Sequence, residues 1–371
     1  MLSRERVERS FAHREADRIP IDFGTTIVTS MDLKAYKVLK KKVGIRLPDD
    51  MIIDHTMGTA APCEQLQNLF HCDFRRVSMN YLPPPIIDEK FTNGFGIVFQ
   101  KAPGHEYFDV VYNPLQEPDI QILEQMMMPD PHNPAMYFGL EKKTQDLYKQ
   151  TEYALVADFG VPGFYETSQK LRGYENLACD LLLEPEFIHS LYEKLFELQK
   201  AFFTNYLAPI GKYISVVCYA DDLGMQDRPQ ISPQLYKDII KPWHKAIFRH
   251  IRTLTDAKIL LHSCGAIVPL LDDLIDAGVD IINPVQIRAA GMEPEFLKKT
   301  FGDRLIFWGG LDEQYLLPNG TPEEIEIEAK RLIKIFGENG GYVFAPSHNF
   351  QSDTPPENII AMYKNLDNQA G

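Results

Sequence analysis

The chain has 371 residues, which is long for a single domain but usual for an α/β barrel with insertions. Hydrophobic residues make up 44% of it, enough for a large buried core, so intrinsic disorder is not expected. The 38 basic and 52 acidic residues give a formal net charge of −14. Because no basic run offsets this acidic excess, the composition excludes nucleic acid as an expected partner.

The cysteines and the first residues bear on the cellular compartment. A disulfide framework needs pairs, but this chain has an odd, scattered set: Cys63, Cys72, Cys179, Cys218 and Cys264. Residues 1–18 are densely charged and lack the apolar core of a signal peptide. No apolar run approaches the length needed to cross a bilayer. We therefore expect free thiols and a cytoplasmic protein with no membrane association.

Short apolar runs rich in β-branched and aromatic residues alternate along the chain with stretches of helical periodicity, the pattern of repeated βα units. Eight such runs are predicted strands: 19–24, 72–77, 153–160, 213–222, 258–265, 279–285, 304–312 and 341–349. Most are near-continuously apolar, as strands covered on both faces should be. Eight parallel strands close a barrel, so the sequence predicts a (β/α)8 TIM barrel.

Three serine– or threonine–proline pairs mark predicted helix starts, with an N-cap hydroxyl followed by proline at the first helical position. They are Ser232-Pro233, Thr321-Pro322 and Thr354-Pro355. Residues 78–151 break the alternation with short segments interrupted by proline and glycine, which predicts a hairpin or loop insertion between the second and third strands. No linker divides the chain, so we expect one barrel domain over 1–371, with an N-terminal extension and this insertion.

Barrel active sites lie at the carboxyl ends of the strands. His262 and Cys264 are two residues apart at the end of the fifth predicted strand, so they point to the same face, where imidazole and thiolate can share Zn²⁺. His348 ends the eighth strand, and a third ligand there would leave the fourth position open, as in catalytic zinc sites. The alternatives are a packed histidine beside a buried thiol, and a His348 that binds substrate or caps a loop.

Other polar side chains follow the remaining strands. The adjacent carboxylates Asp221 and Asp222 can share a proton or orient a metal ligand; the alternative is that one of them only caps the following turn. The expected catalytic residues are Asp222, Glu166 and Tyr219. Aromatic side chains near the mouth suit a flat or apolar substrate, although loop packing explains them equally well. The expected substrate-binding residues are Phe164, Tyr165, Asn283, Gln286 and Asp312.

Several segments together resemble the uroporphyrinogen decarboxylase-like superfamily. They are RERVERSFAHREADRIPIDFG, YADDLGMQDRPQISPQLYKDIIKPWHKAI, HSCGAIVPLLDDLIDAGVDIINPVQ, FWGGLD and APSHNFQSDTPPENI. The similarity covers nearly the whole chain and is weakest over 78–151. The resemblance implies a (β/α)8 barrel and one of two chemistries: metal-free decarboxylation of porphyrinogen acetates, or zinc-dependent methyl transfer to or from a corrinoid cofactor.

Two motifs separate these chemistries. The decarboxylases carry an R-Q-A-G-R-Y segment after the first strand, whereas residues 19–26 read IPIDFGTT and contain no arginine. The methyltransferases bind zinc through an H-x-C…C pattern, and His262-Ser263-Cys264 matches its first half. No cysteine follows Cys264, and His348 falls where the last cysteine of the pattern is expected. Imidazole also binds Zn²⁺, so the resemblance favours His262, Cys264 and His348 as the metal ligands.

The sequence therefore predicts a zinc-dependent methyltransferase that moves a methyl group between a small donor and a corrinoid protein. One thiolate with two imidazoles leaves zinc more cationic than two thiolates would, which favours a Lewis acid acting on an O-methyl donor over activation of a thiol acceptor. Asp222 or Glu166 would complete the zinc shell or handle the leaving group's proton. The alternatives are a metal-free decarboxylase or lyase using Asp222 and Tyr219, and a non-catalytic barrel that binds a corrinoid or a partner protein.

Overall fold

The computed structural model describes residues 1–46, 52–104, 107–364 and 366. At its centre is a parallel sheet in the order β13-β12-β11-β10-β9-β8-β4, in which neighbours in sequence are neighbours in space. The strands are β4 (Phe74–Val77), β8 (Ala154–Pro162), β9 (Val216–Ala220), β10 (Lys258–His262), β11 (Ile281–Asn283), β12 (Ile306–Leu311) and β13 (Tyr342–Pro346). These match the last seven of the eight predicted strands, and their order is that of a βα barrel.

The first predicted strand, 19–24, forms only a bridge, but it fills the gap between the two edge strands. Asp22 N donates to Phe344 O at 3.0 Å, and Phe344 N donates to Pro20 O at 2.9 Å. On the other side, Asp73 N donates to Ile21 O at 2.8 Å. Because proline has no N–H, the segment cannot extend a full ladder, and Ile21 remains a single parallel bridge to Phe344. The (β/α)8 prediction is confirmed, with its first strand reduced to this bridge.

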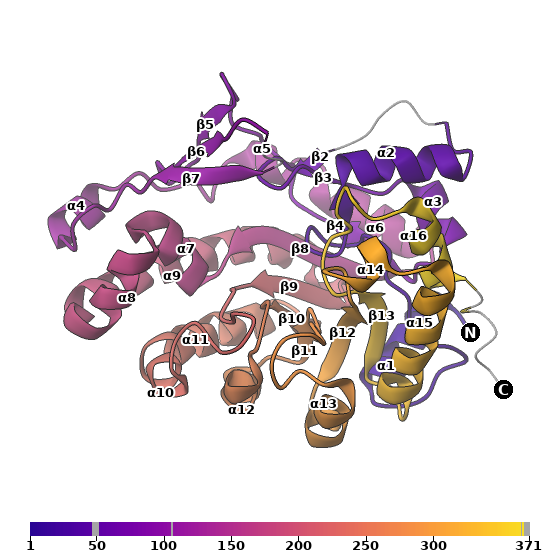
Figure 1. The fold of residues 1–371 in the computed structure, drawn as a ribbon. Coiled ribbons are helices and arrows are strands. Elements are labelled where there is room, and N and C mark those ends of the chain that lie inside the picture. The colour runs from indigo at the N-terminus through magenta and orange to yellow at the C-terminus, as the bar shows by residue number, and fades with distance from the viewer. Residues whose placement is uncertain (47–51, 105–106, 365, 367–371) are drawn as a thin grey trace.

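Helices cover the outer face of the sheet (Figure 1). They are α1 (Ser3–Phe11), α6 (Leu140–Gln150), α7 (Phe164–Arg172), α8 (Tyr174–Leu183), α9 (Pro185–Ile210), η1 (Gly211–Tyr213), α10 (Pro233–Leu235), η2 (Tyr236–Ile240), α11 (Lys241–Arg252), η3 (Val268–Leu270), α12 (Leu271–Ala277), α13 (Pro294–Phe301), α14 (Leu316–Asn319), α15 (Pro322–Gly337) and α16 (Pro356–Tyr363). Among the helices of the described ranges, none is both long enough and apolar enough to span a membrane.

Two of the three predicted helix starts are confirmed. The Ser232 hydroxyl accepts from Leu235 N at the start of α10, and Thr321 forms a capping box with Glu324 at the start of α15. The prediction for Thr354 is wrong. Helix α16 begins at Pro356, the second of two prolines, so Thr354 lies one residue too early to cap it.

A small sheet that the sequence did not predict lies between the first barrel segment and β4. Its order is β1-β3-β2, with α2 and α3 beside it: β1 (Met31–Asp32), α2 (Leu33–Lys42), β2 (Ile52–Asp54), β3 (Thr59–Ala60) and α3 (Glu64–Leu69). The strands have only two or three residues, too few to show a hydrophobic period of two. Asp32 caps α2 by accepting from the backbone N–H groups of Lys34 and Ala35.

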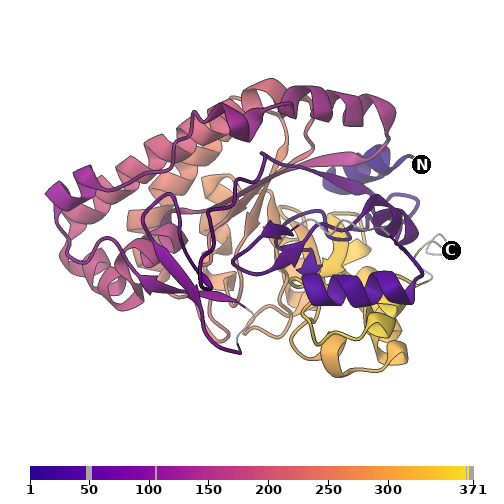
Figure 2. The same cartoon turned by 90° about the horizontal axis from the view of Figure 1, so that it is seen from above.

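The stretch 78–151 contains an antiparallel sheet in the order β5-β6-β7, followed by three helices. The new elements are β5 (Lys90–Thr92), β6 (Val98–Lys101), β7 (Phe108–Tyr112), α4 (Ile120–Gln125) and α5 (Pro134–Tyr137). The last helix, α6, packs on α9 and leads into β8, so it belongs to the barrel's outer layer. The β5-β6-β7 sheet lies above the barrel strands in Figure 1 and crosses over them in the view from above (Figure 2).

Candidate metal centre at the barrel mouth

The three residues predicted to bind zinc lie together at the carboxyl ends of the strands. His262 is the last residue of β10, Cys264 follows two residues later, and His348 follows β13. One potential ligand atom from each lies within 4.8 Å of the other two, and Cys264 Sγ is 3.5 Å from His262 Nε2. Ligands of one tetrahedral zinc ion lie about 3.3–3.8 Å apart. Small side-chain rotations would therefore bring these donors, two nitrogens and a sulfur, onto one zinc ion.

Asn283 fixes the orientation of His262. Its Oδ1 lies 2.6 Å from His262 Nδ1, and its Nδ2 donates to Trp308 O at 3.1 Å. Since the amide oxygen can only accept, Nδ1 carries the proton and Nε2 is left as the ligand atom facing Cys264. Asn283 was predicted to bind substrate. In the structure it is buried beside His262, with both ends of its amide engaged in hydrogen bonds.

The protonation of the ligands follows from their surroundings. Burial, with a smaller contribution from His262, lowers the pKa of His348 from 6.5 to about 4, so its imidazole is neutral at neutral pH. Burial and the Asp222 carboxylate raise the pKa of the Cys264 thiol well above 9. Without a cation the thiol is protonated, and a metal ion that binds there must displace that proton.

Both predicted catalytic carboxylates, Asp222 and Glu166, line the cavity above the candidate ligands. Asp222 Oδ1 accepts from Cys264 N at 2.8 Å and lies 4.0 Å from His262 Nε2. Glu166 pairs with Lys170, whose Nζ is 2.6 Å from its Oε1. Burial raises the pKa of Glu166 above its usual value, while Lys170 acts in the opposite direction. The site thus holds one carboxylate beside the ligands and one that retains a proton more readily.

Three predicted site residues instead belong to the helical layer. The Tyr219 hydroxyl donates to Gln199 Oε1 of α9 at 3.0 Å, so in this structure it is directed away from the candidate ligands. Cys218, Tyr219 and Ala220 all border the cavity, but successive side chains of β9 point to opposite faces, and the Tyr219 hydroxyl is directed to α9. Phe164 is fully buried against Tyr192 and Trp243, and Tyr165 is buried beside it. Packing within the barrel accounts for the burial of Phe164 and Tyr165, and their contact with substrate stays a prediction.

The remaining two predicted substrate-binding residues shape loops. Gln286 Oε1 accepts from Gly265 N at 2.6 Å and so holds the turn that follows Cys264. The Asp312 carboxylate accepts from three successive backbone N–H groups, those of Gln314, Tyr315 and Leu316, at 2.9–3.2 Å. Both side chains act as caps, which the residue type alone does not distinguish from ligand binding.

A cavity of 360 Å³ lies over the candidate metal ligands, and its upper wall comes from the β5-β6-β7 sheet and the segment before it. The wall is apolar: Tyr81, Phe91, Phe95, Ile97 and Phe99. Against this wall stand the carboxylates Asp54, Asp158, Glu166 and Asp222, with Lys170 as the only lysine or arginine in the described lining. Sequence reasoning missed most of these residues. Asp158 was detectable as a polar residue near the end of a strand, but nothing in the sequence placed the insertion over the mouth.

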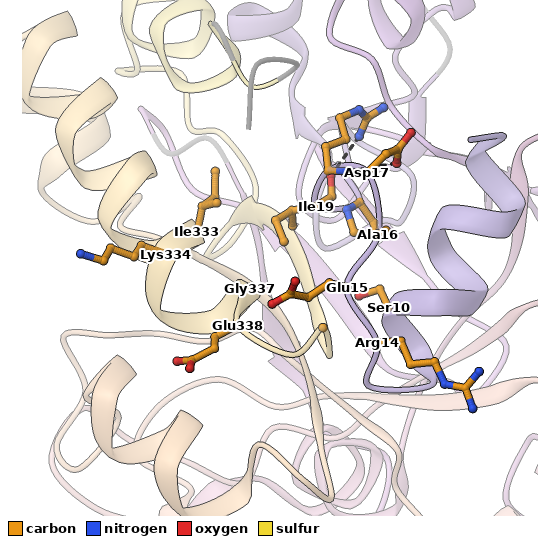
Figure 3. A pocket seen from close by; sticks show the side chains of 13 residues that line it. Ser10, Arg14, Glu15, Ala16, Asp17, Ile19, Ile333, Lys334, Gly337 and Glu338 are labelled. Carbon is orange, nitrogen blue, oxygen red and sulfur yellow. Dashed lines mark hydrogen bonds between the residues drawn. The ribbon is translucent and has the colours of Figure 1, made fainter. Parts of the chain in front are cut away.

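A larger hollow of 730 Å³ lies at the opposite end of the barrel (Figure 3). It is bounded by the segment from Arg14 to Pro20 and by the last turns of α15. Pro20 and Gly340 both precede strands of the barrel, so this hollow is at the amino-terminal face. It contains none of the predicted site residues, and barrel enzymes place their chemistry at the other face.

The closed βα barrel places the chain among proteins whose sites are built from the loops after the strands. The profile of the uroporphyrinogen decarboxylase (URO-D) family matches residues 163–368, more than half of the chain, so the chain belongs to this family. A uroporphyrinogen decarboxylase from Coxiella burnetii is 26% identical over 198 residues, covering 51% of this chain and 49% of that protein. The methylcobamide:CoM methyltransferase MtaA from Methanosarcina barkeri is 25% identical over 199 residues, covering 52% and 55%.

The chain therefore spans about half the length of the curated relatives it matches. Among solved structures, a methyltransferase from Methanosarcina mazei superposes over 100% of both chains, with a TM-score of 0.70 and 16% sequence identity. At this identity the likeness supports the fold alone. Decarboxylases and methyltransferases are about equally similar in sequence, so the choice between their activities depends on the residues of the site.

Proposed function

We propose that this protein is a zinc-dependent methyltransferase that moves a methyl group between a small donor and the corrinoid cofactor of a partner protein. The observation that carries the proposal is the grouping of His262, Cys264 and His348, with ligand atoms within 4.8 Å of one another at the floor of the cavity. A nitrogen, sulfur and nitrogen set with a fourth side open to the cavity suits a catalytic zinc ion.

The residues around this set have distinct tasks in the proposal. Zn²⁺ bound there would supply a Lewis acid beside the substrate. Asn283 holds the ring of His262 so that Nε2 faces the metal position, and Asp222 fixes the backbone of Cys264. Glu166, with its raised pKa and its Lys170 partner, is the group able to give a proton to the departing oxygen of the donor.

The charge of the cavity argues against the decarboxylase alternative for a porphyrinogen substrate. A molecule with eight carboxylates would meet the carboxylates of Asp54 and Asp222, while the nearby cations Arg76 and Lys170 are already paired with Asp158 and Glu166. Like charges brought together in a cavity repel strongly because little water screens them. The aromatic and acidic lining instead favours an uncharged or cationic donor with an apolar part, such as a methoxy compound.

Metal content and methyl transfer test the proposal together. We expect about one zinc per chain by elemental analysis, and methylation of cob(I)alamin by methanol or an uncharged methoxy compound, followed spectrophotometrically. Cys264→Ser should lose both zinc and methyl transfer. Cys63→Ser is the matched control, because Cys63 is a partly exposed free thiol at the start of α3, and it should retain both. Methyl transfer that survives in C264S would contradict the role of zinc, whereas a parent protein that binds no zinc and transfers no methyl group would favour the metal-free decarboxylase or lyase.

A further inference from the structure

Below the site, three buried polar side chains are linked in a series of hydrogen bonds that the proposed function does not require. The Tyr236 hydroxyl lies 3.1 Å from His244 Nδ1, and His244 Nε2 lies 2.9 Å from Asp221 Oδ2. All three residues are fully buried. Because a carboxylate only accepts, Nε2 of His244 carries a proton and its Nδ1 accepts from the tyrosine.

This series of hydrogen bonds ends at Asp221, which connects three parts of the site. Asp221 Oδ2 accepts from Tyr165 N at 3.1 Å, and Oδ1 accepts from Glu166 N at 2.8 Å, so the carboxylate holds the first turn of α7. The backbone N–H of Asp221 donates to His262 O at 2.9 Å. The position of this one carboxylate therefore bears on Glu166, on the adjacent Asp222 and on the end of β10.

The local sequence is adapted to this contact. A Cβ atom on Gly163 would lie 2.5 Å from both Cβ and Cγ of Asp221, so only glycine lets α7 begin this close to the carboxylate. Tyr236 opens η2, a single π-helical turn ahead of α11, and such turns often occur at functional sites. The close approach of α7 and the π-helical turn both fit a functional requirement on the position of the Asp221 carboxylate.

Packing alone does not explain a histidine here. His244 stacks on Phe248 and contacts the rings of Phe164 and Tyr219, an environment that phenylalanine would fill without any hydrogen-bonding requirement. Burying an imidazole among rings is unfavourable unless both nitrogens are satisfied. We propose that His244, supported by Tyr236, is a positioning residue that fixes Asp221 and thereby sets Glu166 and Asp222 over the metal ligands. This role rests on the function proposed above.

The double variant His244→Phe with Tyr236→Phe tests the role, because it keeps the ring packing and leaves no orphaned tyrosine hydroxyl. We expect kcat for methyl transfer to fall about 10- to 100-fold, the range for lost supporting contacts, while the zinc content is unchanged. Crystal structures of the metal-free variant and parent should show a displaced Glu166 carboxylate. His244→Gln, whose amide can donate to Asp221 and accept from Tyr236, should restore most of kcat and the Glu166 position.

Phe248→Leu is the matched control, because it removes packing from the same layer but leaves the hydrogen-bond chain intact. It should lower the Tm without changing kcat at temperatures where the protein is folded. Equal kcat values for the double variant and F248L, or an unmoved Glu166, would overturn the positioning role. If the parent protein binds no zinc and transfers no methyl group, the proposed function fails, and the Glu166 displacement alone decides this inference.

Discussion

Replacing Asn283 with alanine should weaken zinc binding while leaving all three ligands in place. The amide holds His262 Nδ1 at 2.6 Å and is itself held by Trp308 O at 3.1 Å, so the imidazole is clamped through two hydrogen bonds. Without this acceptor the ring can rotate, and binding must then fix it again. Loss of such a partner typically weakens metal affinity 10- to 100-fold, or about 1.4–2.7 kcal/mol.

The zinc dissociation constant is measured by competition with a chromogenic chelator at constant pH. Asn358→Ala is the control, because Asn358 is equally buried and its Nδ2 donates to Leu317 O and Gly320 O at 2.8 Å, in a part of the barrel without metal ligands. It should lower stability and leave zinc affinity unchanged. An N283A protein with the parental dissociation constant, or an N358A protein weakened as much, would refute the clamping argument.

Three further outcomes follow from the structure. Asp73→Ala should reduce the free energy of unfolding in urea by about 3–5 kcal/mol, because it removes a fully buried carboxylate that pairs with Arg6 and Arg18 and accepts from Ile21 N. Asp272→Ala, which loses only an exposed ion pair, should change this free energy by less than about 1 kcal/mol. In the metal-free protein the free energy of unfolding should fall as the pH is lowered from 6.5 to about 4, because the unfolded chain binds a proton there that native His348 does not. His348→Gln should flatten this part of the stability profile. Superimposable profiles of the variant and the parent would contradict the assignment to His348. Incubation with uroporphyrinogen should yield no coproporphyrinogen by chromatography, and turnover at an ordinary enzymatic rate would contradict the charge argument.

The barrel could be predicted from the sequence because its strands are continuous apolar runs separated by capped helices. The exceptions have local causes. Pro20 limits the first strand to a bridge, and the strands of the β1-β3-β2 sheet are too short to show a period. The β5-β6-β7 sheet is antiparallel as the broken pattern of 78–151 suggested, but its place above the mouth depends on contacts distant in sequence. Local patterns specify such elements without specifying what they cover.

In the candidate site, too, local sequence patterns predicted some features, and others depend on the fold. His262 and Cys264 could be paired from their spacing on one strand, and His348 from its place at the end of another. The polar residues around them were recognised, but the hydrogen bonds that they form were not: Asn283 holds the ring of His262, and Asp312 caps a turn. A side chain's type fixes what hydrogen bonds it can form, whereas its partner is fixed by the fold.

If His348 binds the ion in place of the second cysteine of the H-x-C…C pattern, as we propose, the exchange has an electrostatic consequence that fits the cavity. Zn²⁺ with two thiolates and one neutral imidazole has no net charge, whereas with one thiolate and two neutral imidazoles it carries a single positive charge. In the cavity, Asp158 and Glu166 are paired with Arg76 and Lys170. Asp222 has no lysine or arginine partner among the described residues and lies 4.0 Å from His262 Nε2, beside the position that the ion would take. In the proposed site the Asp222 carboxylate would balance the extra charge, so a His348 ligand and Asp222 would support each other in a way that neither residue reveals alone.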